Sequence, residues 1–460
     1  MTVWCDGHNY DGVNNEREDR NISQNHVAHV IFDKIRDRPN YPIKSIVSDR
    51  ESAFNCKIEK KKAWDGKRVA MNQLYGDWET NFRQLPSYMR ALEHCNDGTK
   101  VQWKFNKEDG IVYSWKKIFR YVFWYFGATK CTFQHSHPTV TVDATHLCGA
   151  YKGKAVVAIV KTANNRVVPV AYAIIDEESN HIWYCMEHAR ANMMGSILKK
   201  KGLYDLCWAV GTELDEAKYM KALADLIDTS LAASTYLQRI LLEKWTLFLD
   251  GFHKWGVTTS NDTESYNNVL RGDRFLPIRA FVQATQAKAM AIFAYELMKI
   301  NRYRSALVPI SSETFDANKM HARRYEISLY PNTPRRTFSV RSSPLRLGVA
   351  GSEHTVRFDM GSCTYLIWDT YRIPCSHAMA VAKILNVLRL DLVHRCYTRD
   401  GWRQHFSDVF HPLPNYWPEF EFLLLPDDSR MIHHTGRGRK RINRRQLGSR
   451  DYANRIGPKP

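Results

Sequence analysis

Three strand-like runs between residues 139 and 176 constrain the fold of this 460-residue chain more than any other feature. The runs TVTVDATHL, KAVVAIVKTA and VVPVAYAIID are rich in β-branched residues, and the short breaks GAYKG and NNR separate them. Tight breaks with Gly or Asn between such runs favour antiparallel pairing of successive strands. With helical patterns on both sides, they predict an α/β (α+β) fold whose central domain opens with a three-strand meander.

Helical spacing of apolar residues flanks these runs. Upstream it covers residues 26–35 and 60–74, so residues 26–130 are expected to form a helical domain. Downstream, helical patterns continue to about residue 303 and would complete a core domain over residues 137–305. Further on, residues 309–343 are interpreted as a loop or linker, and 378–388 as a helix after a compact β-containing segment.

Charge points to a polyanionic partner. The chain has 66 Lys and Arg against 48 Asp and Glu, a formal net charge of +18. Such an excess favours nucleic acid through counterion release and long-range steering. No apolar run reaches membrane-spanning length, and the N-terminus has no secretory pattern, so cytosol or nucleus is expected. In such a reducing compartment the ten cysteines would be thiols or metal ligands.

Basic residues are densest in the tail over residues 430–460, which contains GRGRKRINRRQ. Such a cluster is typical of a nuclear-import signal or an arm that binds DNA phosphates, and a merely solvated tail is the alternative. The candidate DNA-binding residues are Arg437, Arg439, Lys440, Arg441, Arg444 and Arg445.

Three stretches resemble blocks of the Mutator-like transposases. Residues 137–183 contain VDATHL followed by GAYKG, residues 245–278 contain TTSNDTESYNN, and GSCTYLIWDTYRIPCSHA is similar to a SWIM-type zinc finger. The stretches occur in the order found in the family. With weaker similarity upstream, the likeness covers most of residues 20–445.

The resemblance implies an RNase H-like core that cleaves DNA with two Mg²⁺ ions held by a D-D-E set of carboxylates. Asp143 matches the first position, and the alternation of strand faces points it away from Val140 and Val142. Glu264 matches the last position, in the first turn of a helix that Ser260 to Asp262 could cap.

The middle Asp of the set has no match. In the family a helix and an I-S-D-R strand follow the tryptophan that Trp183 resembles, whereas here YCMEH follows at once. The IVSDR at residues 46–50 matches the upstream helical region instead, while Asp176 or Glu178 could supply a carboxylate. We therefore expect an incomplete core without DNA cleavage.

Other Cys and His residues carry weaker signals. Cys185 and His188 form a C-x-x-H pair, and two ligands do not close a tetrahedral site, so a packed Cys beside a hydrogen-bonded His is expected. Cys131, His135 and His137 are interpreted as loop residues.

At the N-terminus, residues 1–25 resemble the remnant of a zinc-containing DNA-binding module. Cys5 and His8 match the end of its ligand set, and Tyr10 occupies the next Cys position.

The SWIM-like segment, within residues 345–395, implies a zinc site. The family pattern is C-x-C followed by C-x-H, which places ligands at Cys363, Cys375 and His377 but Tyr365 where the second thiolate belongs. Arg372 also replaces a Gly that often precedes I-P-C. Structural zinc takes four N or S ligands, so three ligands and a water would bind Zn²⁺ weakly. A metal-free fold with Tyr365 in the core is the alternative.

The resemblance therefore predicts a nuclear, transposase-derived protein that binds zinc and DNA without cleaving DNA. A transcriptional regulator of the far-red-response type, or an active transposase using Asp176 or Glu178 with Mg²⁺, remains an alternative. DNA is the expected partner and self-association is left open. Neither a membrane nor a small-molecule substrate is expected.

Overall fold

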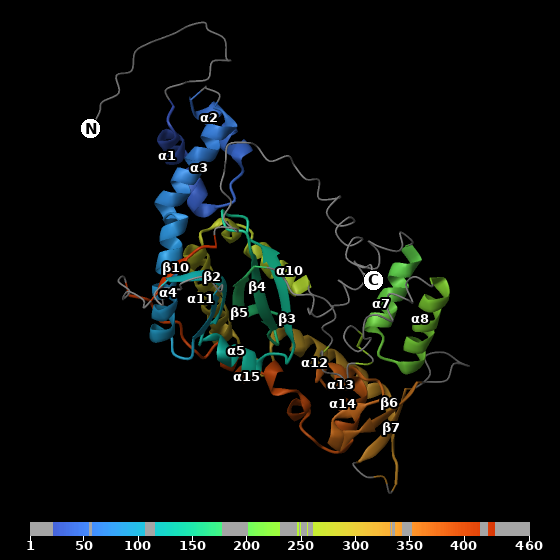
Figure 1. The fold of residues 1–460 in the computed structure, drawn as a ribbon. Helices are drawn as coiled ribbons and strands as arrows, with labels where there is room; N and C mark the ends of the chain where they lie inside the picture. Colours follow the sequence, from blue (N-terminus) through green and yellow to red (C-terminus); the bar gives the residue numbers. More distant parts are fainter. Residues whose placement is uncertain are drawn as a thin grey trace, which may run out of the picture.

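The computed structural model (Figure 1) describes most of the chain between residues 22 and 427. The described residues are 22–54, 58–105, 116–176, 201–230, 246–247, 249, 255, 261–331, 333, 336–342, 352–414 and 422–427. Among these residues, no helix is both long and apolar enough to span a membrane. The described chain is a mixture of helices and two mainly antiparallel sheets, as the expected α+β class requires.

Three helices begin the described chain: α1 (Gln24–Asp37), α2 (Ile43–Phe54) and α3 (Lys60–Tyr75). They share a small apolar core that is separate from the main one. Helices α1 and α3 come close at Gly66, where an added Cβ would lie 2.5 Å from Cγ1 of Val27. The IVSDR segment lies within α2, as expected for the upstream helical region.

The expectation of helix throughout residues 26–130 is wrong at its C-terminal end. Helix α4 (Trp78–Cys95) follows α3, but β1 (Lys100–Phe105) and β2 (Lys116–Tyr125) are strands of the main sheet. They pair antiparallel with each other, and β2 also pairs antiparallel with β5, the last strand of the meander.

The expected three-strand meander is confirmed. It comprises β3 (Val140–His146), β4 (Lys154–Lys161) and β5 (Val167–Ile175), paired antiparallel in sequence order. The main sheet has the order β1-β2-β5-β4-β3, and β10 (Leu423–Leu425) pairs parallel with β2.

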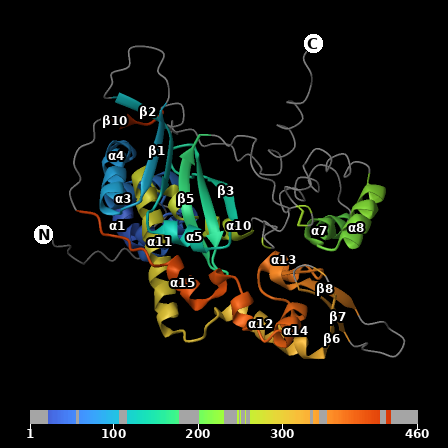
Figure 2. The same cartoon turned by 90° about the horizontal axis from the view of Figure 1, so that it is seen from below.

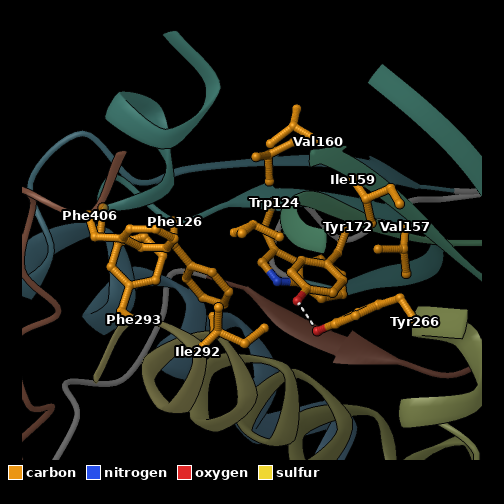
Figure 3. Close-up of a cluster of buried hydrophobic side chains, with 14 of the residues drawn as sticks. Trp124, Phe126, Val157, Ile159, Val160, Tyr172, Tyr266, Ile292, Phe293 and Phe406 are labelled. Atoms are coloured by element: carbon orange, nitrogen blue, oxygen red, sulfur yellow. Dashed lines mark hydrogen bonds between the residues drawn. The ribbon is translucent and has the colours of Figure 1, made fainter. Parts of the chain in front are cut away.

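Helices α4, α10 (Asn261–Val269) and α11 (Ile278–Arg302) contribute side chains to the core on one face of this sheet. Figure 3 shows the centre of this core, where the rings of Trp124 and Tyr172 stack with centroids 5.4 Å apart. The hydroxyl groups of Tyr172 and Tyr266 are 2.8 Å apart, which joins β5 to α10. The core therefore fixes α10 against the meander, next to β3.

Two pairs of helices complete this part of the molecule. Helices α5 (Thr129–His135) and α15 (Arg399–His405) pack together beside the sheet, although they lie far apart in the sequence (Figure 1). Helices α7 (Lys201–Thr212) and α8 (Glu216–Thr229) form a hairpin, in the region expected to be helical.

A second, four-stranded sheet follows, with the order β6-β7-β8-β9 (Figure 2). Its strands are β6 (Tyr325–Leu329), β7 (Thr337–Ser342), β8 (Glu353–Arg357) and β9 (Ser362–Cys363). Helices α12 (Pro309–His321) and α14 (Ser376–Ile384) pack against each other, and α13 (Ile367–Tyr371) follows β9.

The interpretation of residues 309–343 as a linker is therefore wrong. Pro309 occupies the first turn of α12, where its missing N–H costs nothing, so this proline begins a helix. The expected helix at 378–388 is present as α14, which begins at Ser376 and ends at Ile384.

Candidate metal centre

Three predicted ligands, Cys363, Cys375 and His377, converge in the second sheet unit, which comprises the sheet β6-β7-β8-β9 and the helices α13 and α14 that follow it. Cys363 is the last residue of β9, Cys375 is the N-cap of α14, and His377 lies in the first turn of that helix. All three are buried, and one ligand atom from each lies within 4.8 Å of the others. In the part of the chain that the structure describes, this is the only group of three or more Cys, His, Asp or Glu side chains close enough to share a metal ion.

Three residues near the ligands have a left-handed backbone conformation, one before Cys363 and two between Cys363 and Cys375. Gly361 has φ of 62°, Leu366 of 63° and Arg372 of 56°. Glycine adopts such a φ without strain, whereas a residue with a Cβ does not. Arg372 ends α13 and turns the chain towards Cys375, so a glycine would adopt the backbone conformation of this position with less strain.

Hydrogen bonds and apolar packing hold the ligands in place. The Cys363 backbone N–H donates to Oδ2 of Asp369 at 2.9 Å, and Cys363 Sγ accepts from the Tyr365 backbone N–H at 3.4 Å. Around these groups lies the buried core of the second sheet, which includes Val356, Trp368, Ala378 and Val381. The ligands thus form part of a packed interior, and their positions are determined by the fold.

The thiols of Cys363 and Cys375 are coupled through a hydrogen bond. The hydrogen bond from Cys363, with smaller contributions from His377 and the Ala378 backbone, lowers the pKa of Cys375. The same hydrogen bond and burial raise the pKa of Cys363. Thiolate sulfurs and an imidazole nitrogen are donors that zinc prefers. The residues present therefore fit a zinc ion.

Tyr365 is not packed in the core. Its side chain is 47% exposed, and its ring centroid lies 5.1 Å from that of His377. The metal-free alternative with a buried Tyr365 does not match this arrangement.

Sequence reasoning missed two further rings beside His377. The His354 ring on β8 has its centroid 4.5 Å from that of His377, and the Tyr325 ring on β6 lies at 4.6 Å. The Tyr325 hydroxyl is 3.0 Å from Oγ of Ser376. Neither residue belongs to the C-x-C and C-x-H pattern. The signal that could have identified His354 is its position two residues before the buried Val356, on the same strand face.

Asp143 and helix α10, which carries Glu264, lie against each other at one face of the main sheet. Asp143 lies on β3, and Glu264 lies in the first turn of α10 as expected, where it is exposed. Asn267, one turn further along α10, donates through Nδ2 to Oδ2 of Asp143 at 2.8 Å. On the other side of β3, Val140 and Val142 are exposed, so the alternation of faces is as expected.

Asp176, the candidate substitute for the middle carboxylate, does not lie beside Asp143. Arg120 donates through Nε to Oδ2 of Asp176 at 3.3 Å. Asp176 follows Ile175, whose partner Lys154 pairs with His146, three residues along β3 from Asp143. Strand spacing therefore separates the Cα atoms of Asp143 and Asp176 by roughly 16 Å, the result of about 13 Å along the strand and about 10 Å across two strands. Two catalytic metal ions lie only about 4 Å apart.

The interpretation of Cys131, His135 and His137 as loop residues is wrong for the first two and incomplete for the third. Cys131 and His135 lie in α5. His137 is buried, and its ring lies 5.5 Å from that of Trp255 and 5.3 Å from that of Tyr397. Neither of its ring nitrogens has a hydrogen-bond partner among the described residues, and burial lowers the pKa of His137 to about 4.

Several predicted site residues fall outside the described residues. Trp183, Cys185, His188, Glu178 and the N-terminal Cys5, His8 and Tyr10 are among them. So are the candidate DNA-binding residues of the tail, Arg437, Arg439, Lys440, Arg441, Arg444 and Arg445.

Comparison of the chain with protein-family models, with curated proteins and with solved structures gave no match.

Proposed function

We propose that this chain is a transposase-derived, DNA-associated protein of the nucleus, with an incomplete RNase H-like core and a SWIM-type zinc module. The observation that carries the proposal is the convergence of Cys363, Cys375 and His377 in one buried group. The first residue ends a strand and the other two begin the helix α14, as the C-x-H motif of such a module requires.

Zinc in this module would have a structural role. Cys363 would tether β9, and Cys375 and His377 would tether α14, so that one ion joins the sheet to its helix. Binding of a structural zinc ion contributes directly to folding free energy, by about 10–16 kcal/mol in isolated fingers. The module has its own apolar core, so its dependence on zinc should be smaller than that of a finger.

DNA cleavage is not part of the proposal. The carboxylate of Asp143 accepts a hydrogen bond from the side-chain amide of Asn267. Another acidic residue of α10, Asp262, forms an ion pair with Lys161 at 2.8 Å. The candidate middle carboxylate, Asp176, is bonded to Arg120 at a distance from Asp143 that a pair of metal ions does not span. These contacts favour a scaffold that retains the fold of a nuclease without its metal pair.

DNA association is supported by the net charge of +18. Binding through Lys and Arg to phosphates releases counterions, so affinity should fall steeply as salt rises. The basic tail is the part of the chain where such contacts would be densest.

The test is retention of the full chain on duplex DNA over a range of salt concentrations, with a Mg²⁺-dependent plasmid-nicking assay on the same preparation. We expect retention that weakens with salt, that falls on deletion of residues 430–460, and that is accompanied by no nicking. Absence of retention at low salt would refute the DNA-binding role. Nicking that Asp143→Ala abolishes would replace it with an active transposase.

A further inference from the structure

The rings of His354 on β8 and of Tyr365, two residues after β9, lie beside each other. Val356 pairs with Cys363 in the β8–β9 ladder, and the Thr364 backbone N–H donates to the Thr355 carbonyl at 3.0 Å. The chain then turns, and the Leu366 backbone N–H donates to the Cys363 carbonyl at 2.7 Å, so Tyr365 lies in the turn that follows β9. The ring centroids of His354 and Tyr365 are 5.2 Å apart, so the two side chains reach the same space.

This space borders the three buried ligands. His354 and Val356 lie on the same face of β8, and Val356 packs in the core that contains Cys363 and Cys375. The His354 ring reaches to within 4.5 Å of the His377 ring, measured between centroids, with 41° between their planes. Two imidazoles bound to one zinc ion at about 2 Å would have centroids about 5 Å apart, close to the observed separation. His354 lies outside the group whose ligand atoms are all within 4.8 Å of one another, so its ring would have to move towards the two sulfur atoms on binding.

A hydroxyl group is in position to orient the ring. Nδ1 of His354 lies 3.4 Å from Oγ1 of Thr364, which also accepts a hydrogen bond from the Thr355 backbone N–H at 2.9 Å. A ligating histidine commonly donates its second ring N–H to such an oxygen, which fixes the tautomer and leaves the other nitrogen for the metal. Contact with Thr364 would therefore direct Nε2 of His354 towards the metal.

We propose that His354 is the fourth metal ligand and that it replaces, from the opposite strand, the thiolate missing at position 365. The site would then be a tetrahedral Cys₂His₂ set, in which His354, whose ring lies beside that of His377, joins the convergent group of Cys363, Cys375 and His377. The inference rests on the proposed zinc module. An imidazole is a common zinc ligand, whereas a neutral phenol is a poor one. With His354 as a ligand, the site would not need a ligand at position 365, where Tyr365 is 47% exposed.

The experiment compares zinc affinity, measured by competition with a chromogenic chelator, for the full chain and a set of variants. His354→Ala and His354→Asn should weaken zinc binding by at least about 10-fold, the least that disturbance of a metal's surroundings usually costs. Tyr365→Phe, the matched control, should bind zinc as the wild type does. Cobalt substitution supplies a spectroscopic check, because the d–d bands of bound Co²⁺ depend on the donor set and should change in the two His354 variants but not in Tyr365→Phe.

A double variant makes the result independent of folding defects. The change of His354→Ala together with Tyr365→Cys returns a thiolate to the position that the family uses, and it should restore the affinity lost in His354→Ala. Unaltered zinc affinity and an unaltered Co²⁺ spectrum in His354→Ala would overturn the proposal, as would a loss confined to Tyr365→Phe. Failure of the zinc module itself gives a different result, since Cys375→Ser would then bind zinc as well as the wild type.

Discussion

Asn267 on α10 donates a hydrogen bond to the carboxylate of Asp143 on β3 at 2.8 Å, and thereby ties the helix to the edge of the meander. Asn267 is 9% exposed. Asp143, the residue predicted to be the first metal-binding carboxylate, thus takes part in a hydrogen bond that holds α10 against β3.

Asn267→Ala should lower the free energy of unfolding by about 1–2 kcal/mol, because a buried hydrogen bond to a charged group is lost. The neighbouring Asn268 is exposed, and Asn268→Ala should change stability by less than about 0.5 kcal/mol. Urea unfolding of the three proteins measures both values. Equal effects of the two substitutions would show that the Asn267–Asp143 contact contributes nothing specific.

The hydroxyl pair of Tyr172 and Tyr266 should behave as one unit. Both side chains are buried and their oxygens are 2.8 Å apart, so Tyr172→Phe or Tyr266→Phe alone leaves one hydroxyl without its partner. Each single change should cost about 1–3 kcal/mol, and the double change less than the sum. A double-mutant cycle by chemical unfolding gives the coupling energy, and strict additivity would contradict the pairing.

Stability should fall in mild acid because of His137. Burial, with smaller contributions from Lys161, His405 and His394, lowers its pKa to about 4. The imidazole of His137 takes up a proton near pH 6.5 in the unfolded chain but only near pH 4 in the folded chain. The free energy of unfolding is therefore highest above about pH 6.5 and falls as pH decreases towards about 4. The loss amounts to about 3 kcal/mol at most.

His137→Phe should remove this part of the pH dependence, and unfolding in urea between about pH 7 and pH 4.5 measures it. His405, whose pKa burial also lowers to about 4, is unaltered in the variant and continues to contribute a slope of the same sign. The same slope in wild type and variant would mean that His137 takes up a proton in the folded state.

Arg372→Gly should stabilise the second sheet unit. Arg372 has φ of 56°, a conformation that costs a residue with a Cβ about 1–2 kcal/mol, of which the greater chain entropy of glycine offsets a part. We expect a gain of about 0.5–1 kcal/mol in thermal unfolding. Asn386→Gly is the control, since asparagine tolerates its φ of 53° and should gain less. Destabilisation by Arg372→Gly would indicate that the arginine side chain makes contacts worth more than the strain.

The meander and the ligand trio could be predicted from sequence because their signals are local. The runs of β3 to β5 alternate within themselves and pair with their sequence neighbours. Cys375 and His377 lie within one short motif. Strand β2 was missed although it pairs with its sequence neighbour β1; its other partner, β5, follows only after β3 and β4, and that pairing leaves no local pattern.

His354 could not be identified from the motif for a similar reason. Its nearness to Tyr365 depends on the pairing of β8 with β9 and on the turn that follows β9, and neither leaves a pattern in the sequence around His354. The segment 309–343 was misread because a proline marks a helix start as well as a loop. The place of His354 therefore depends on tertiary pairing, whereas the start of α12 depends on a local signal that has two meanings.

The central claim is that Cys363, Cys375 and His377 hold zinc, and the metal content of the purified full chain tests it most directly. Elemental analysis should find one zinc ion per chain, removed by a strong chelator with a fall in melting temperature and restored on adding Zn²⁺. Cys375→Ser should purify without zinc, while Cys396→Ser, which alters an equally buried thiol outside the group, should keep it. Equal zinc content in these two variants, or none in the wild type after exposure to Zn²⁺, would contradict the account.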